Sequence, residues 1–183
     1  MSRILLFILL IFSYSGINAQ VTTFGDSKPE DFDFLPYAGK RVIQGFRVDM
    51  GGEKYCIVYS KSQKGVTPDS MFVQSFIKKD EKWQVLANSI RTSSNTLFIW
   101  GRRGGFFTDA NKNGVAYTAF SEEDLETEKR FIVGYFILYK DEVYTIEESA
   151  EGLIFKSKNY EKLPSEITNR VEEAFGKLDK WKS

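Results

Sequence analysis

The sequence predicts a mainly β protein, all-β to α+β, built as an antiparallel meander or sandwich with one C-terminal amphipathic helix. The first observation is a series of short apolar and aromatic runs between residues 41 and 155, separated by glycine, asparagine, aspartate and other turn residues. The second is an apolar repeat at three- and four-residue spacing after Pro164. A chain of 183 residues is long enough for one domain with a buried core.

Residues 1–19 contain a charged, an apolar and a small polar segment in the order typical of a secretory signal peptide. Arg3 supplies a positive charge, Ile4–Phe12 is apolar without a break, and Ser13–Ala19 is short, polar and small. The apolar run is too short to span a bilayer, which needs roughly 20 residues. We therefore expect export to the periplasm, cell surface or medium, removal of the segment after Ala19, and no stable membrane insertion afterwards.

Residues 20–40 are predicted to form an extended N-terminal leader rather than core, followed by a single β-rich domain over residues 41–183. Prolines and glycines interrupt this leader, and acidic residues alternate with Phe32 and Phe34. The alternation over residues 31–34 predicts either a short edge strand or an arm held down by the two phenylalanines.

The β-type runs predict a series of strands joined by tight turns. They are Arg41–Asp49, Lys54–Ser60, Met71–Lys78, Trp83–Ile90, Leu97–Trp100, Phe106–Phe107, Val115–Phe120, Phe131–Tyr139, Val143–Ile146 and Leu153–Phe155. Gly101–Gly105 is predicted to be a hairpin tip. Phe131–Tyr139 is apolar at successive positions, which is typical of a central strand covered on both faces, with a bulge or close contact at Gly134.

The predicted helix covers residues 165–182, with Ser165 as its N-cap. Its apolar positions lie on one face and include Ile167, Val171, Phe175 and Leu178. Such a face on the last element of a β domain most often covers the core.

Composition excludes several classes of function. The chain has no histidine and one cysteine, Cys56, which excludes Ser-His-Asp and Cys-His catalysis and nearly excludes zinc. Cys56 is predicted to be a small buried strand residue. The 25 basic and 25 acidic residues balance, so the chain as a whole has no electrostatic reason to bind nucleic acid.

The segment Asp109–Gly114 spaces oxygen-bearing side chains as calcium loops do. Asp109, Asn111 and Asn113 occupy the first three ligand positions, but the later acidic ligands are missing. The sequence predicts either no cofactor or weak calcium binding. The alternative is a β-turn in which Asp and Asn cap the backbone and Asn113-Gly114 supplies positive φ.

Residues Phe106–Ala116 resemble the F-x-D-x-N-x-D-G-x-x-E signature of exported bacterial β-rich proteins with a D-x-N-x-[DN]-G loop. The resemblance extends over residues 54–146 through a preceding tryptophan hairpin and a following hydrophobic strand. Asn113 and Tyr117 stand where that group has acids. The resemblance implies a β-rich exported protein, and some members of the group are linked to cell-surface polysaccharide.

Two further groups are candidates for binding or chemistry. Trp100, Arg102 and Arg103 could hold a phosphate, a carboxylate or an acidic sugar, or form a solvated hairpin tip. The acid runs at 122–124 and 147–148 could supply glycosidase carboxylates, but adjacent strand residues point to opposite faces. Solvated charge is the favoured interpretation of both acid runs.

These observations favour an exported, non-enzymatic binding or scaffold domain of the bacterial cell envelope, without deciding whether the chain is an enzyme. No catalytic residue is assigned, and an envelope carbohydrate or envelope protein is the expected partner. The alternative is a small carbohydrate-active hydrolase that uses carboxylates only. A structural or inhibitory module without a small ligand is a third interpretation.

Overall fold

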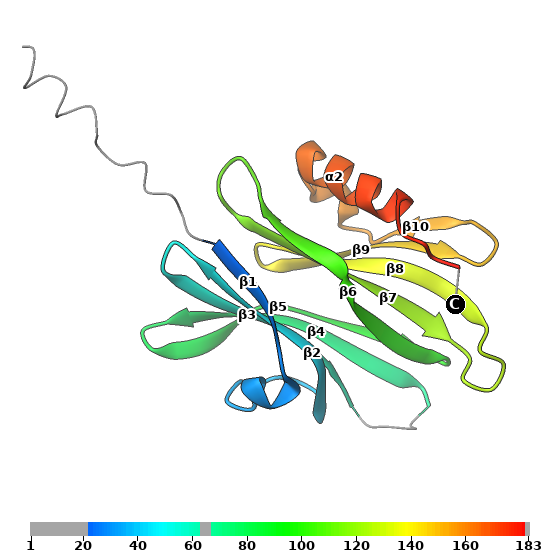
Figure 1. The fold of residues 1–183 in the computed structure, drawn as a ribbon, viewed down its shortest axis with the longest axis horizontal. Coiled ribbons are helices and arrows are strands. Elements are labelled where there is room, and N and C mark those ends of the chain that lie inside the picture. Colours follow the sequence, from blue (N-terminus) through cyan, green and yellow to red (C-terminus); the bar gives the residue numbers. More distant parts are fainter. Residues whose placement is uncertain (1–21, 63–66, 182–183) are drawn as a thin grey trace, which may run out of the picture.

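A computed structural model describes residues 22–62 and 67–181, and these form two five-stranded antiparallel sheets with a C-terminal helix (Figure 1). Sheet A has the order β1-β2-β3-β4-β5 and sheet B the order β10-β9-β8-β7-β6. The predicted mainly β class is confirmed, while the predicted signal peptide, residues 1–19, lies outside the described residues.

The elements of sheet A and its flanking segment are β1 (Thr22–Ser27), η2 (Pro29–Phe32), β2 (Arg41–Met50), β3 (Glu53–Lys61), β4 (Asp69–Lys79) and β5 (Lys82–Ser93). Those of sheet B and its covering segment are β6 (Thr96–Thr108), β7 (Gly114–Glu123), β8 (Arg130–Tyr139), β9 (Glu142–Ser149), β10 (Ile154–Lys156), η3 (Tyr160–Lys162) and α2 (Ser165–Gly176).

The inner faces of the two sheets pack against each other, which makes the fold a sandwich. One buried cluster joins β2, β3 and β4 of sheet A to β6, β7 and β8 of sheet B. Within it the rings of Phe120 and Phe136 stack with centroids 4.2 Å apart, and Tyr59 packs 6.2 Å from Phe136. Alternate residues of each strand fill this layer because successive side chains of a strand point to opposite faces.

Strand β8 is the central strand of sheet B and is buried on both faces, as its sequence predicts. Tyr135 and Ile137 pack under α2, while Phe136 and Leu138 pack between the sheets. The close contact predicted at Gly134 is also present. A Cβ atom there would lie 2.6 Å from the Phe120 ring, so only glycine allows this approach.

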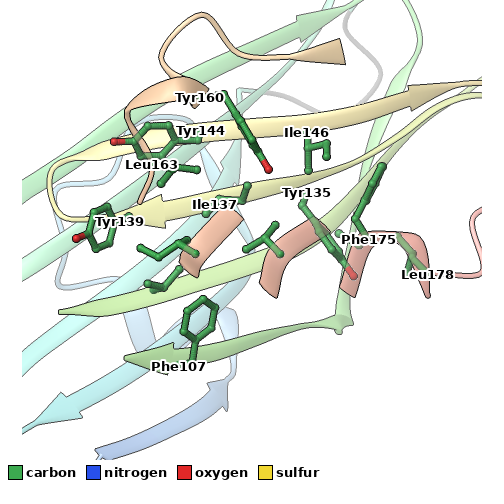
Figure 2. Packing of buried hydrophobic residues seen from close by; sticks show 14 of the residues in the cluster. Phe107, Tyr135, Ile137, Tyr139, Tyr144, Ile146, Tyr160, Leu163, Phe175 and Leu178 are labelled. Carbon is green, nitrogen blue, oxygen red and sulfur yellow. The ribbon is translucent and has the colours of Figure 1, made fainter. Parts of the chain in front are cut away.

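Helix α2 covers the outer face of sheet B (Figure 2). Ile167 and Val171 are fully buried, and Phe175 packs edge-on against Tyr135 with centroids 5.4 Å apart. The predicted range 165–182 is too long, because the helix ends at Gly176. The next residues turn back onto sheet B, where Arg130 donates to the Lys180 carbonyl at 2.7 Å. The N-cap is Pro164, not Ser165.

The segment before β2 is built into the domain, so the prediction of a leader outside the core is wrong for the described residues. β1 is an edge strand of sheet A and pairs with β2. Residues 31–34, predicted as either a short edge strand or an arm held down by two phenylalanines, form no strand. Phe32 and Leu35 are buried on the outer face of sheet A with Cys56. Phe32 reaches this site because Gly45 has no side chain; a Cβ there would lie 2.2 Å from its ring.

The hairpin tip predicted at Gly101–Gly105 is instead the middle of β6. Trp100 pairs with Ala119 and Gly104 with Thr118, so residues 101–103 bulge out of the ladder. β6 is an edge strand of sheet B, and its bulge carries two exposed arginines. Bulges and charges on an edge strand hinder pairing with another chain, which gives these residues a structural role.

Candidate functional site

The outer face of sheet A bears an open pocket of about 410 Å³, which we call the sheet A hollow. Six of the side chains that line it are two aromatic rings and four charged groups. They are Phe34, Arg47, Asp49, Lys54, Lys78 and Trp83. All belong to β2, β3, the β4–β5 hairpin or the segment that follows η2.

The aromatic part of the hollow is a pair of rings from distant parts of the sequence. Phe34 and Trp83 lie with centroids 5.6 Å apart and planes inclined by 44°. Phe34 is 52% exposed, so its ring is open to solvent. The Arg47 guanidinium lies 5.9 Å from the Phe34 centroid and donates to the Asp31 carbonyl at 2.8 Å, which fixes the arginine beside the ring.

Charge in the hollow is mainly positive. Arg47, Lys54 and Lys78 contribute three cations, against Asp49 among the lining residues and Glu81, which pairs with Lys78. Asp49 accepts a hydrogen bond from the Gly52 backbone at 3.3 Å. An anionic ligand would therefore meet a net attractive field here.

Cys56 lies in the wall of the hollow but is not an activated nucleophile. It is 1% exposed, as the sequence predicts, and burial raises the pKa of its thiol to about 11 despite the opposing effect of Arg47. A thiol with this pKa stays protonated near neutral pH, and the thiolate is the reactive form. The arrangement is thus suited to binding rather than covalent chemistry.

The structure places the predicted ligand residues Trp100, Arg102 and Arg103 on the other sheet. The Trp100 indole donates to Ser121 Oγ at 3.0 Å, and the Arg130 guanidinium lies 4.6 Å from its ring centroid. Trp100 packs against the cluster under α2, whereas Trp83 packs on the outer face of sheet A. Arg102 and Arg103 are exposed in the β6 bulge and do not line the sheet A hollow.

The Asp109–Gly114 loop folds as a hairpin loop between β6 and β7. The Asp109 carboxylate accepts hydrogen bonds from the Asn113 backbone at 2.7 Å, the Asn113 side chain at 2.8 Å and Tyr139 at 2.8 Å. Lys112, not Asn113 or Gly114, has positive φ. Asn111 is exposed, and a cation would have to displace the donors of Asp109, so weak calcium binding stays a prediction. No cluster of three or more metal-ligating acids or thiols occurs within 22–62 and 67–181.

Asp109 should make the stability of the protein sensitive to acid. Burial alone would raise the pKa of its carboxyl, but hydrogen bonds from Asn113 and Tyr139 lower it below the ordinary value. The ionised group therefore stabilises the folded state above its unfolded pKa of about 4, and this contribution is lost as pH falls through the folded value. We expect urea unfolding at neutral pH to show Asp109→Asn as less stable than wild type, and the difference in free energy of unfolding to become smaller in acid. A difference that stays constant with pH would contradict this expectation.

The prediction of solvated charge in the two acid runs is wrong for Glu122 and Glu147, which are buried between the sheets. Arg91 of β5 donates from Nε to Glu122 at 2.7 Å and from Nη1 to Glu147 at 2.6 Å. We call these three residues the Arg91 cluster. Ser93 Oγ also donates to Glu122 at 2.8 Å.

The neighbouring acids do point to the opposite face, as strand geometry requires. Glu123 pairs with Arg130 at 2.9 Å, and Glu148 accepts from the Trp181 indole at 3.0 Å. The two buried carboxylates share one guanidinium and do not line the sheet A hollow. They join sheet A to sheet B and are not arranged as a free acid and base.

No protein-family model, curated protein or solved structure matches this chain. The resemblance of residues 106–116 to exported β-rich proteins therefore stays a prediction. Among residues 22–62 and 67–181, no helix has the length and apolar character needed to cross a membrane.

Proposed function

We propose that this chain is an exported, non-enzymatic binding domain of the bacterial cell envelope that holds an acidic carbohydrate in the sheet A hollow. The observation that carries the proposal is the ring pair of exposed Phe34 and partly buried Trp83, beside Arg47, Lys54 and Lys78. The secretory pattern of residues 1–19 and the resemblance of residues 106–116 support the location.

The chemistry of the hollow suits a sugar ring that carries a carboxylate. The C–H faces of a sugar are apolar and stack on aromatic rings, while its hydroxyl and carboxylate oxygens need hydrogen-bond donors. Trp83 and Phe34 offer the rings, and Arg47 offers a planar guanidinium. The volume of about 410 Å³ lies within the range of about 300–1,000 Å³ common for ligand sites.

Binding without cleavage is favoured over the hydrolase alternative. Hydrolysis of a glycosidic bond by carboxylates needs two of them on either side of the bond. Asp49 is the one carboxylate among the described residues that line the hollow, and the buried pair Glu122 and Glu147 is held by Arg91.

The test is the affinity of variants for an oligosaccharide of uronic acids, measured by calorimetry. We expect Trp83→Ala and the double variant Lys54→Gln/Lys78→Gln each to weaken binding about tenfold. Added salt should weaken binding by wild type, because the attraction between exposed charges is screened. A neutral oligosaccharide of the same length should bind less tightly.

The matched control is Arg102→Gln/Arg103→Gln, which removes two exposed positive charges from sheet B. It should bind like wild type. Loss of binding in this control alone would indicate that the binding site lies at the β6 bulge. Unchanged affinity in both hollow variants would reject the proposal. Cleavage of the oligosaccharide, abolished by one Asp or Glu substitution, would support the hydrolase instead.

A further inference from the structure

A second pocket, of about 160 Å³, opens at one end of the sandwich, where turns of both sheets meet. The β2–β3 turn contributes Met50 and Glu53, the β6–β7 loop contributes Lys112–Gly114, and the β8–β9 turn contributes Lys140. These turns lie at the same end of the molecule in Figure 1. We call this space the end pocket.

The walls of the end pocket are apolar and come from both sheets. Ile57 and Leu86 line it from sheet A, and Phe106 and Leu138 from sheet B. Leu86 is the extra residue of a bulge in β5, because Ser75 pairs with Ala87 and Phe76 with Val85. The volume is close to that of a protein cavity of about 150 Å³ known to hold one benzene molecule.

Ser75 places an unpartnered hydroxyl against this space. The residue is 6% exposed, and its Oγ has no hydrogen-bond partner. Ser75 lies opposite Ile57 in the ladder between β3 and β4, so the two side chains share the inward face of sheet A. A buried hydroxyl without a partner lowers stability, and a ligand atom that hydrogen-bonds to it would remove that cost.

The mouth of the end pocket is cationic. Lys112 and Lys140 are exposed there, and Glu53, which accepts a hydrogen bond from Tyr55, is the acid that lines the same mouth. Lys140 Nζ lies 5.2 Å from the centroid of the Tyr139 ring. Two ammonium groups against one carboxylate favour a ligand with a negative end facing solvent.

We propose that the end pocket binds a small aromatic carboxylate with a polar substituent at the opposite end of its ring. The ring lies between the apolar walls, the substituent hydrogen-bonds to Ser75 Oγ, and the carboxylate faces Lys112 and Lys140. This site opens between the sheets rather than on the outer face of sheet A. It is therefore independent of the carbohydrate proposed for the sheet A hollow.

The probe is 4-hydroxybenzoate, compared with benzoate and phenol in calorimetric titrations of the purified protein. We expect 4-hydroxybenzoate to bind with a dissociation constant below about 1 mM and each partial analogue to bind more weakly. Ser75→Ala should weaken the binding of 4-hydroxybenzoate about fivefold, since one hydrogen bond is lost, and should leave the affinity for benzoate unchanged. The same variant should melt no earlier than wild type, because it removes an unpartnered hydroxyl.

The cationic mouth is tested with Lys112→Gln/Lys140→Gln, against Lys158→Gln as a control at an exposed lysine outside the pocket. The double variant should bind 4-hydroxybenzoate and benzoate several-fold more weakly than wild type and bind phenol with unchanged affinity. The control should bind all three probes as wild type does. Absence of saturable binding of 4-hydroxybenzoate up to about 10 mM would overturn the proposal. So would a Ser75→Ala variant that binds 4-hydroxybenzoate as tightly as wild type.

Discussion

Arg91→Met is expected to lower the free energy of unfolding by about 3–5 kcal/mol. The Arg91 side chain is 20% exposed, and those of Glu122 and Glu147 are 9% and 11% exposed. Removal of the guanidinium leaves two carboxylates close together between the sheets without a counter-charge. Glu122 would keep only the hydrogen bond from Ser93 among the contacts described above.

Urea unfolding at neutral pH measures this loss of stability. Two further variants test whether the unpaired carboxylates cause it. The triple variant Arg91→Met/Glu122→Gln/Glu147→Gln should recover most of the stability, because it removes the whole charged cluster instead of breaking it. Arg102→Met, at an exposed arginine, should change stability by no more than about 0.5 kcal/mol. A triple variant no more stable than Arg91→Met would show that repulsion between the carboxylates is not the cause.

Phe175→Ala is expected to lower the free energy of unfolding by about 3–5 kcal/mol, and deletion of residues 164–183 should unfold the domain. Phe175 is 3% exposed and packs against Tyr135 on the outer face of sheet B. Without α2 that face would expose Val133, Tyr135 and Ile137 to water. The loss of so large an apolar contact exceeds what a small domain tolerates.

Circular dichroism and urea unfolding test both changes. Asn169→Ala, at an exposed position of the same helix, is the control and should alter stability by no more than about 0.5 kcal/mol. A truncated chain that stays folded and soluble would contradict the core role of α2. It would indicate that the helix serves as a docking element for a partner.

The strands of this fold could be predicted because their signal is local. Alternation of apolar residues marks strands with one covered face, and the unbroken apolar run of β8 marks a strand covered on both. The hairpin tip was wrongly predicted from the glycines of β6, because glycine occurs both in turns and in closely paired strands. A Cβ at Gly104 would lie 2.3 Å from the Tyr117 carbonyl, a constraint that appears only once β7 is in place.

The candidate sites could not be predicted, because each joins residues that are far apart in the chain. Phe34 meets Trp83 only after the segment following η2 folds over sheet A. Arg91 is 31 residues from Glu122 and 56 from Glu147, so no local pattern indicates that these acids are buried. The end pocket likewise depends on a β5 bulge that the sequence does not mark.

The most direct test of the binding proposal is the set of indole N–H signals of the three tryptophans in a proton–nitrogen NMR spectrum. Trp83 lies in the sheet A hollow, while Trp100 and Trp181 donate to Ser121 and Glu148 on the side of sheet B. Titration with an oligosaccharide of uronic acids should shift the Trp83 signal in a saturable manner and leave the other two in place. A shift of the Trp100 signal alone, or of none of the three, would contradict the proposed site.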